Sequence, residues 1–254
     1  MHKTALALLL LFSLLLTGAH ADPLTLSEDL AGVFCWPDGT TPETASYTYE
    51  YHLPQVVEDS EAAIAINGTY RYQMEDTAAF GVPMKGEMFA GSDGVSCTVQ
   101  TYRICCNSDE IFSVLQTQET VHDGARQISY SAHTFGRSTD KPNYVLTLPY
   151  LLDILEDEEM DDWLKDRQTL RASECVRQLI WDEYERRLAL GEDLPADLTE
   201  EDLLYEFYPE EDFYYDEATD SLVFFLQPYL WGDESDEGHW AAFPFTIEEI
   251  LDEL

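Results

Sequence analysis

The first third of the chain contains a strand pattern followed by a helix pattern. In residues 46–54 ("SYTYEYHLP"), tyrosines recur at every second position, which predicts a strand with one buried face. Residues 58–75 ("EDSEAAIAINGTYRYQME") place apolar side chains at intervals of four, which predicts a helix, and Ser60 can accept a hydrogen bond from its first turn. The residues at this interval are Ile66, Tyr70 and Met74.

Three segments rich in β-branched and aromatic residues come next. They cover residues 96–106, 110–121 and 126–137, and the turn-forming sequences "NSDE" and "HDG" separate them. Short connections of this kind join neighbouring antiparallel strands. We therefore predict an antiparallel meander.

The second half begins with helical patterns and returns to strands. Residues 146–166 and 169–191 are each typical of a helix, and Gly191 is a plausible stop for the second. A hairpin follows, in which residues 222–226 are apolar on both faces, as in a strand covered on both sides. Residues 246–254 form a last amphipathic turn or helix. Strands and helices in separate blocks predict an α+β fold with antiparallel sheets packed against helices in two layers, and with a C-terminal β-hairpin followed by a short helix.

The N-terminus has the pattern of a secretory signal peptide. One cation, Lys3, precedes an apolar run from Ala5 to Leu16, and the sequence Ala-His-Ala ends at residue 21. We predict cleavage of residues 1–21 and a soluble, secreted protein; a retained N-terminal anchor is the alternative. No later segment approaches the ~20 apolar residues of a membrane span. Residues 22–44, with the turn-rich sequence "PDGTTPET", are expected to be a linker or lead-in.

The charge is strongly negative. The chain carries 13 Lys and Arg against 51 Asp and Glu, a net charge of −38, and cleavage after Ala21 would remove only Lys3 and leave −39. With 45% hydrophobic and 13% aromatic residues, the chain is nevertheless expected to fold. The last 67 residues, after Arg187, contain 21 acids and no Lys or Arg. Such a field repels nucleic acid and anionic lipid and attracts basic proteins.

Five cysteines remain after the predicted cleavage, so at least one is left unpaired within the chain. Cys97 and Cys105 are eight residues apart on one predicted strand, and either could meet Cys35 across a neighbouring strand. We expect one structural disulfide among these three in an exported protein. The cysteine and histidine spacings match no zinc pattern, so we expect no metal site.

No motif for catalysis is present. The chain has no Gly-rich phosphate loop, no Gly-x-Ser-x-Gly and no His-Glu-x-x-His sequence, and no cofactor is expected. With so many acids, a suggestive carboxylate pair arises by chance. The sequence "DESDEG" at 233–238 lacks the spacing of a calcium loop. A non-catalytic protein is therefore favoured over an enzyme.

The order of these segments resembles a known family, the PdaC/RsiV-like extracytoplasmic domain. The resemblance covers about Tyr47 to Leu254 and includes "FSVL", "HDGARQISYSAHTF", "LTLPYLL" and "FPFTIEEI". Its most specific part is "DFYYDEATDSLVFFLQPY", whose matching positions are Phe213, Tyr214, Leu222, Phe224, Gln227, Pro228 and Tyr229. The family includes the sensor portions of lysozyme-responsive anti-sigma factors and modules attached to peptidoglycan deacetylases. The resemblance implies an extracytoplasmic fold, with an N-terminal lobe at 45–146 and a PdaC/RsiV-like lobe at 147–254.

One segment departs from the family pattern and is the candidate binding site. Residues 230–240 ("LWGDESDEGHW") place one tryptophan on each side of an acidic run. Interfaces combine aromatic anchors with charges in this way. The candidate residues are Tyr229, Trp231, Asp233, Glu234, Asp236, Glu237, His239 and Trp240. We expect a binding or sensing module at the bacterial cell envelope that captures a cationic, lysozyme-like protein. The alternative is a peptidoglycan-handling enzyme or accessory domain that binds cell-wall glycan.

Overall fold

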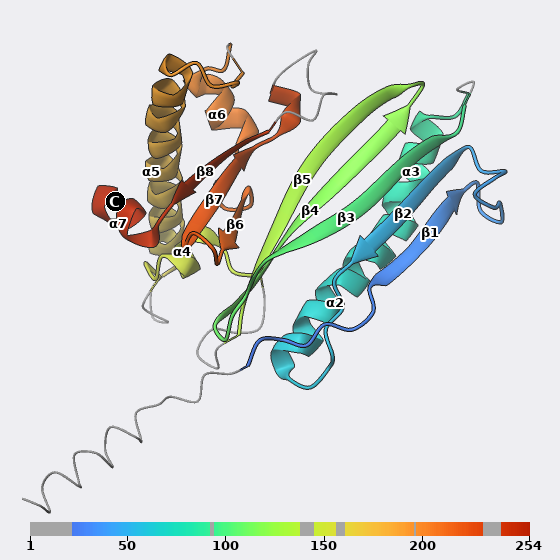
Figure 1. Ribbon diagram of the computed structural model, residues 1–254, viewed down its shortest axis with the longest axis horizontal. Helices are drawn as coiled ribbons and strands as arrows, with labels where there is room; N and C mark the ends of the chain where they lie inside the picture. Colours follow the sequence, from blue (N-terminus) through green and yellow to red (C-terminus); the bar gives the residue numbers. More distant parts are fainter. Residues whose placement is uncertain (1–21, 92–93, 138–144, 156–160, 196, 231–239) are drawn as a thin grey trace, which may run out of the picture.

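The computed structural model describes residues 22–91, 94–137, 145–155, 161–195, 197–230 and 240–254 (Figure 1). The predicted signal peptide and most of the candidate loop lie outside these residues. Within the described part of the chain, no helix is long and apolar enough to cross a membrane.

The first half forms a five-stranded mixed sheet in sequence order (Figure 1). Its strands are β1 (Leu30–Trp36), β2 (Tyr47–Leu53), β3 (Ser96–Asn107), β4 (Ile111–His122) and β5 (Ala125–Gly136). The predicted antiparallel meander is confirmed for β3–β4–β5. Strands β2 and β3 are parallel, however, because a helical crossover returns the chain to the starting end of the sheet. That crossover contains α2 (Glu61–Asp76), the π-helical turn η1 (Thr77–Gly81) and α3 (Val82–Met88).

Helix α2 packs on one face of this sheet, as its four-residue pattern predicts. Ser60 caps the helix by accepting a hydrogen bond from the Ala63 backbone N–H at 3.2 Å. The side chains of Ile66, Tyr70 and Met74 are buried against apolar residues of the sheet. The helix prediction and its buried face are therefore both confirmed.

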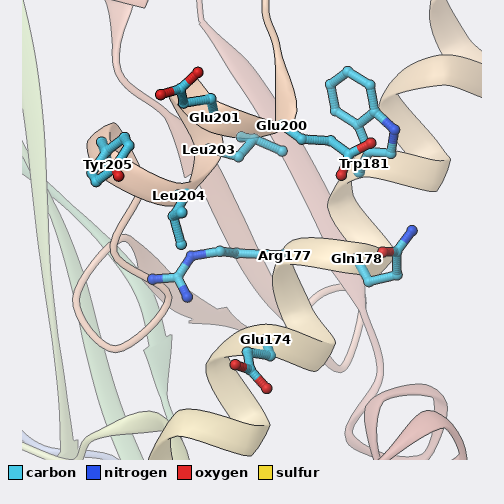
Figure 2. Close-up of a pocket in the computed structure, with 9 residues that line it drawn as sticks. All are labelled: Glu174, Arg177, Gln178, Trp181, Glu200, Glu201, Leu203, Leu204 and Tyr205. Atoms are coloured by element: carbon cyan, nitrogen blue, oxygen red, sulfur yellow. The ribbon is translucent and has the colours of Figure 1, made fainter.

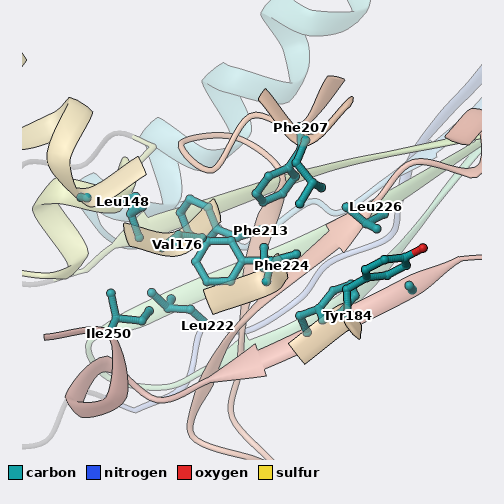
Figure 3. Close-up of a cluster of buried hydrophobic side chains, with 14 of the residues drawn as sticks. Leu148, Val176, Tyr184, Phe207, Phe213, Leu222, Phe224, Leu226 and Ile250 are labelled. Carbon is teal, nitrogen blue, oxygen red and sulfur yellow. The ribbon is translucent and has the colours of Figure 1, made fainter. Parts of the chain in front are cut away.

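The second half builds a three-stranded antiparallel sheet covered by helices, which confirms the α+β fold class (Figure 1). The strands are β6 (Phe213–Asp216), β7 (Ser221–Leu226) and β8 (Ala241–Phe245), and the helices are α4 (Leu148–Leu151), α5 (Asp162–Ala189), α6 (Glu200–Glu206) and α7 (Ile247–Glu253). All six residues of β7 are buried, as its two apolar faces predict. The core between sheet and helices includes Val176, Phe207, Phe224 and Ile250 (Figure 3).

Four elements differ from the sequence predictions. The two helices expected at 146–166 and 169–191 are instead the short α4 and the 28-residue α5, which begins after the Asp161 cap. No Gly or Pro separates Lys165 from Thr169, so nothing interrupts α5 there. The expected lead-in at 22–44 contains β1, and β8 precedes the last helix.

The expected disulfide is not formed, since all five cysteines are free thiols. The strand register gives the reason. Cys35 on β1 is opposite Thr48 of β2, and Thr48 is opposite Cys97 of β3. Two strand spacings separate the cysteines by about 10 Å, beyond the ~7 Å limit for bridged Cα atoms. Cys105 lies eight residues further along β3 and also does not border β1.

The two sheets are joined by apolar and polar contacts. Leu115 of β4 forms a buried cluster with Tyr214, Val223 and Phe225 of the smaller sheet. The Arg103 guanidinium donates a hydrogen bond to the Tyr214 hydroxyl at 3.2 Å and also lies over its ring. This junction fixes the smaller sheet, and the helices on it, relative to the five-stranded sheet.

Candidate functional site

The predicted binding segment is only partly described. Trp231, Asp233, Glu234, Asp236, Glu237 and His239 lie outside the described residues. Trp240 is half-buried, and its ring lies 4.9 Å from that of Tyr130 and 6.1 Å from that of Phe225, measured between centroids. Tyr229 is 41% exposed and donates a hydrogen bond to the Glu206 carbonyl at 3.0 Å. Trp240 therefore supports the junction between the sheets, whereas Tyr229 adjoins the end of α6.

Tyr229 belongs to a larger surface that the sequence analysis missed. We call it the acidic–aromatic surface, and it consists of Glu200, Glu201, Leu204, Tyr205, Glu206, Tyr208 and Tyr229. Leu204, Tyr205 and Tyr208 are 53%, 62% and 52% exposed, so apolar and aromatic side chains gather on one exposed surface. The Tyr208 hydroxyl donates to the Tyr205 carbonyl at 3.0 Å, which fixes one of these rings.

The position of α6 follows from a local sequence signal. Thr199 caps the helix and accepts from the Asp202 backbone N–H at 3.2 Å, while the Asp202 carboxylate accepts from the Thr199 backbone N–H at 2.8 Å. This capping box keeps the pKa of Asp202 below its ordinary value through the hydrogen bonds from Thr199. The pattern Thr-x-x-Asp before an apolar pair would have identified the helix from the sequence. Acids in the first turn also interact favourably with the helix dipole, which accounts for Glu200 and Glu201 structurally.

A groove between α5 and α6 borders this surface (Figure 2). Its volume is about 470 Å³, and its walls include Trp181, Leu203 and Tyr205 as well as Glu174, Glu200 and Glu201. That volume is within the range of small-ligand pockets. Figure 2 shows Arg177 extending from α5 toward Leu204 and Tyr205.

Arg177 is the one cation among the described residues that line the groove. Its Nε atom is buried and has no hydrogen-bond partner in the described part of the chain. Three carboxylates against one guanidinium leave the groove negatively charged. This charge is compatible with a cationic ligand and unfavourable for an anionic one.

A second cavity, of about 490 Å³, lies between β5 and the segment that leads into β6. Its walls include Ala132 and His133 of β5, Leu146, and the acids Glu210, Glu211 and Asp212. Burial raises the pKa of Asp212 to about 6, although hydrogen bonds from Tyr208 and Gln227 oppose this effect. Burial also lowers the pKa of His133 below its ordinary value, which favours the neutral imidazole at pH 7.

Neither cavity has the composition of a metal centre. Among the described residues, no group of three or more His, Cys, Asp or Glu side chains could hold an ion.

Fold and surface together define an α+β protein with an acidic, aromatic face on its smaller sheet and helices. Two solved structures are similar to this chain. One is a DUF3298 family protein from Pseudomonas aeruginosa PAO1, 11% identical, covering 91% of this chain and 94% of its own, with a TM-score of 0.47. The other is a DUF3298 family member from Bacteroides fragilis, 12% identical, covering 91% and 100%, with a TM-score of 0.43. No family model and no curated protein matches the sequence.

Proposed function

We propose that the protein is a secreted, non-catalytic binding or sensing module of the bacterial cell envelope that captures a cationic protein such as a lysozyme. The observation that carries the proposal is the acidic–aromatic surface. It combines exposed aromatic side chains, which supply binding energy, with carboxylates, which attract and orient a basic partner. The resemblance to lysozyme-responsive sensor domains supports the choice of partner.

The carboxylates of this surface are available to a partner. In the described part of the chain, no Lys, Arg or His forms an ion pair with Glu200, Glu201 or Glu206. Acids elsewhere are partly neutralised, as in the pairs Glu119–Arg126 and Glu183–Arg186. No described side chain therefore pairs with these carboxylates, and a basic protein could supply the missing partners.

The test is the association of residues 22–254 with a C-type lysozyme, compared with a basic protein matched in size and charge. We expect tight binding to lysozyme alone at physiological ionic strength, where the Debye length is ~8 Å. Because attraction between exposed charges is screened, added salt should slow association far more than dissociation. Equal weak binding to both proteins would reduce the effect to non-specific attraction, and no binding would refute the proposal.

Variants locate the site. Tyr205→Ala should weaken lysozyme binding, by about tenfold or more if the ring is an anchor, whereas Tyr72→Ala should not. Tyr72 is a matched control because it is 71% exposed and lies on α2. The pair Glu200→Gln and Glu201→Gln should slow association, while Asp252→Asn with Glu253→Gln on α7 removes the same charge elsewhere. Equal losses in both pairs would show that only net charge matters.

A further inference from the structure

Strand β5 is the edge of the five-stranded sheet on the side of the smaller sheet (Figure 1). In an antiparallel pair, alternate residues turn their backbone N–H and C=O away from the neighbouring strand. In β5 these are the even-numbered residues. Backbone groups of Tyr130 and Thr134 form hydrogen bonds on the side away from β4, which we call outward. Ala132 lies between them in the same register, opposite Leu115 of β4.

Three of the four outward groups on either side of Ala132 are already paired, namely both groups of Tyr130 and the C=O of Thr134. The Gln227 side-chain amide pairs with both backbone groups of Tyr130. Its Oε1 accepts from the Tyr130 N–H at 3.0 Å, and its Nε2 donates to the Tyr130 C=O at 2.8 Å. The second Nε2 hydrogen points to the Asp212 carboxylate at 3.2 Å, which fixes the amide orientation. At the other side, the Leu146 N–H donates to the Thr134 C=O at 2.6 Å.

The outward N–H and C=O of Ala132, which we call the Ala132 rung, have no such partner in the described part of the chain. By this register its N–H and C=O face away from β4, and Ala132 lines the cavity of about 490 Å³, while its methyl group packs with the apolar cluster at the junction of the sheets. The two residues from Tyr130 to Ala132 span about 7 Å of strand, so the open rung repeats the paired one a short distance along the same edge. Gln227 therefore shows which chemistry completes the rung: one amide that donates and accepts in the same plane.

The opposite wall adds a charge preference. Glu210, Glu211 and Asp212 line the cavity, and none of the described residues that line it is a Lys or Arg. The Glu210 carboxylate accepts a hydrogen bond from Ser173 on α5, so it is fixed in place, whereas Glu211 is exposed. A ligand that places a cation toward this wall and an amide on the Ala132 rung satisfies both features.

We propose that this cavity binds an extended peptide segment, with one of its peptide groups paired to the Ala132 backbone and a basic side chain directed toward Glu210 and Glu211. The site is separate from the acidic–aromatic surface and does not depend on the function proposed for that surface. Peptide addition at a sheet edge derives affinity from main-chain hydrogen bonds and specificity from the neighbouring side chains.

The probe is N-acetyl-lysine N-methylamide, followed by amide chemical shifts of the protein on titration. We expect the Ala132 amide to shift with saturation, and the alanine and glutamate analogues to bind progressively more weakly. Ala132→Pro removes only the outward N–H, because the inward ladder bonds are made by Ser131 and His133, and edge strands tolerate such a proline. Loss of one hydrogen bond should weaken binding about fivefold.

A second variant keeps the test independent of the folding of Ala132→Pro. Glu211→Gln should weaken the lysine probe about threefold and leave the alanine analogue unchanged. Glu248→Gln, an exposed acid on α7, should affect neither. The proposal is overturned if the amides of residues 130–134 do not shift, if Ala132→Pro and Glu211→Gln bind as the wild type does, or if N-acetylglucosamine shifts these amides and the peptide probe does not.

Discussion

Replacing Asp212 with Asn tests the electrostatics of the junction between α6 and the sheets. The carboxyl is only 8% exposed. One oxygen, Oδ2, accepts from the Tyr208 backbone N–H at 2.8 Å, and Oδ1 accepts from the Gln227 amide. Burial penalises the charged form more than these bonds favour it, so the pKa rises from 3.8 to about 6. Asn has nearly the same shape and no titration.

The sign of the effect follows from the direction of this shift. A carboxyl whose pKa is higher in the folded state holds its proton more tightly there, so the free energy of unfolding falls as pH rises between 3.8 and about 6. At about 1.4 kcal/mol for each pKa unit, ionisation of folded Asp212 corresponds to about 3 kcal/mol, and about 2 kcal/mol of this falls between pH 4.5 and 7. The Asn variant also loses a carboxylate acceptor, which costs about 1 kcal/mol at every pH.

Urea denaturation of both proteins at several pH values from 4.5 to 7 measures the difference. The variant should gain stability relative to the wild type by about 2 kcal/mol over this interval, with unchanged m-values. Asp252→Asn, an exposed acid on α7, is the control and should follow the wild-type curve. Parallel curves for Asp212→Asn and the wild type would refute a raised pKa at this position.

Three further substitutions probe other contacts. Gln227→Ala should destabilise the fold by about 2 kcal/mol and speed hydrogen exchange at Tyr130, because it leaves that N–H without its partner; unchanged exchange would exclude the edge pairing. Tyr70→Phe should leave the denaturation midpoint unchanged or raise it, since the buried hydroxyl has no hydrogen-bond partner in the described residues; a loss of more than about 1 kcal/mol would reveal an unrecognised one. Gly86→Ala should lower the melting temperature by an amount corresponding to about 1–3 kcal/mol, because the added methyl group would overlap the Trp36 ring, and wild-type stability would contradict that packing.

Periodicity predicted the elements whose buried face is long and regular. The tyrosines of β2, the four-residue stripe of α2 and the two apolar faces of β7 all have this property. Strand β1 was missed because it lies between an acidic start and the turn-rich "PDGTTPET", and its Gly32 weakens the strand pattern. The parallel pairing of β2 and β3 depends on the path of the crossover, which local sequence does not encode.

The proposed binding surface was only partly predictable, for a different reason. Tyr229 and the acidic composition point to the same half of the molecule as the acidic–aromatic surface, but α6 places Tyr205 and Tyr208 beside Tyr229 through tertiary packing. The open rung at Ala132 has no sequence signal at all, because it arises from which backbone groups Gln227 and Leu146 leave unpaired. Similarly, Trp240 has the residue type of an anchor, and only the packing on Tyr130 and Phe225 assigns it to the junction.

Asp212 connects the two proposed binding regions. Its Oδ2 holds the backbone of Tyr208 in the acidic–aromatic surface, and its Oδ1 holds Gln227 beside the open rung. Ionisation strengthens both bonds, since both donors are N–H groups, yet burial makes the ionised form less stable. Binding geometry and stability therefore favour opposite protonation states, as is common where a buried acid serves a site. As the pH falls from 7 to 5, the wild type should gain stability relative to Asp212→Asn, while its relative affinity for lysozyme and for the lysine probe falls. Parallel affinity profiles would show that Asp212 fixes neither surface.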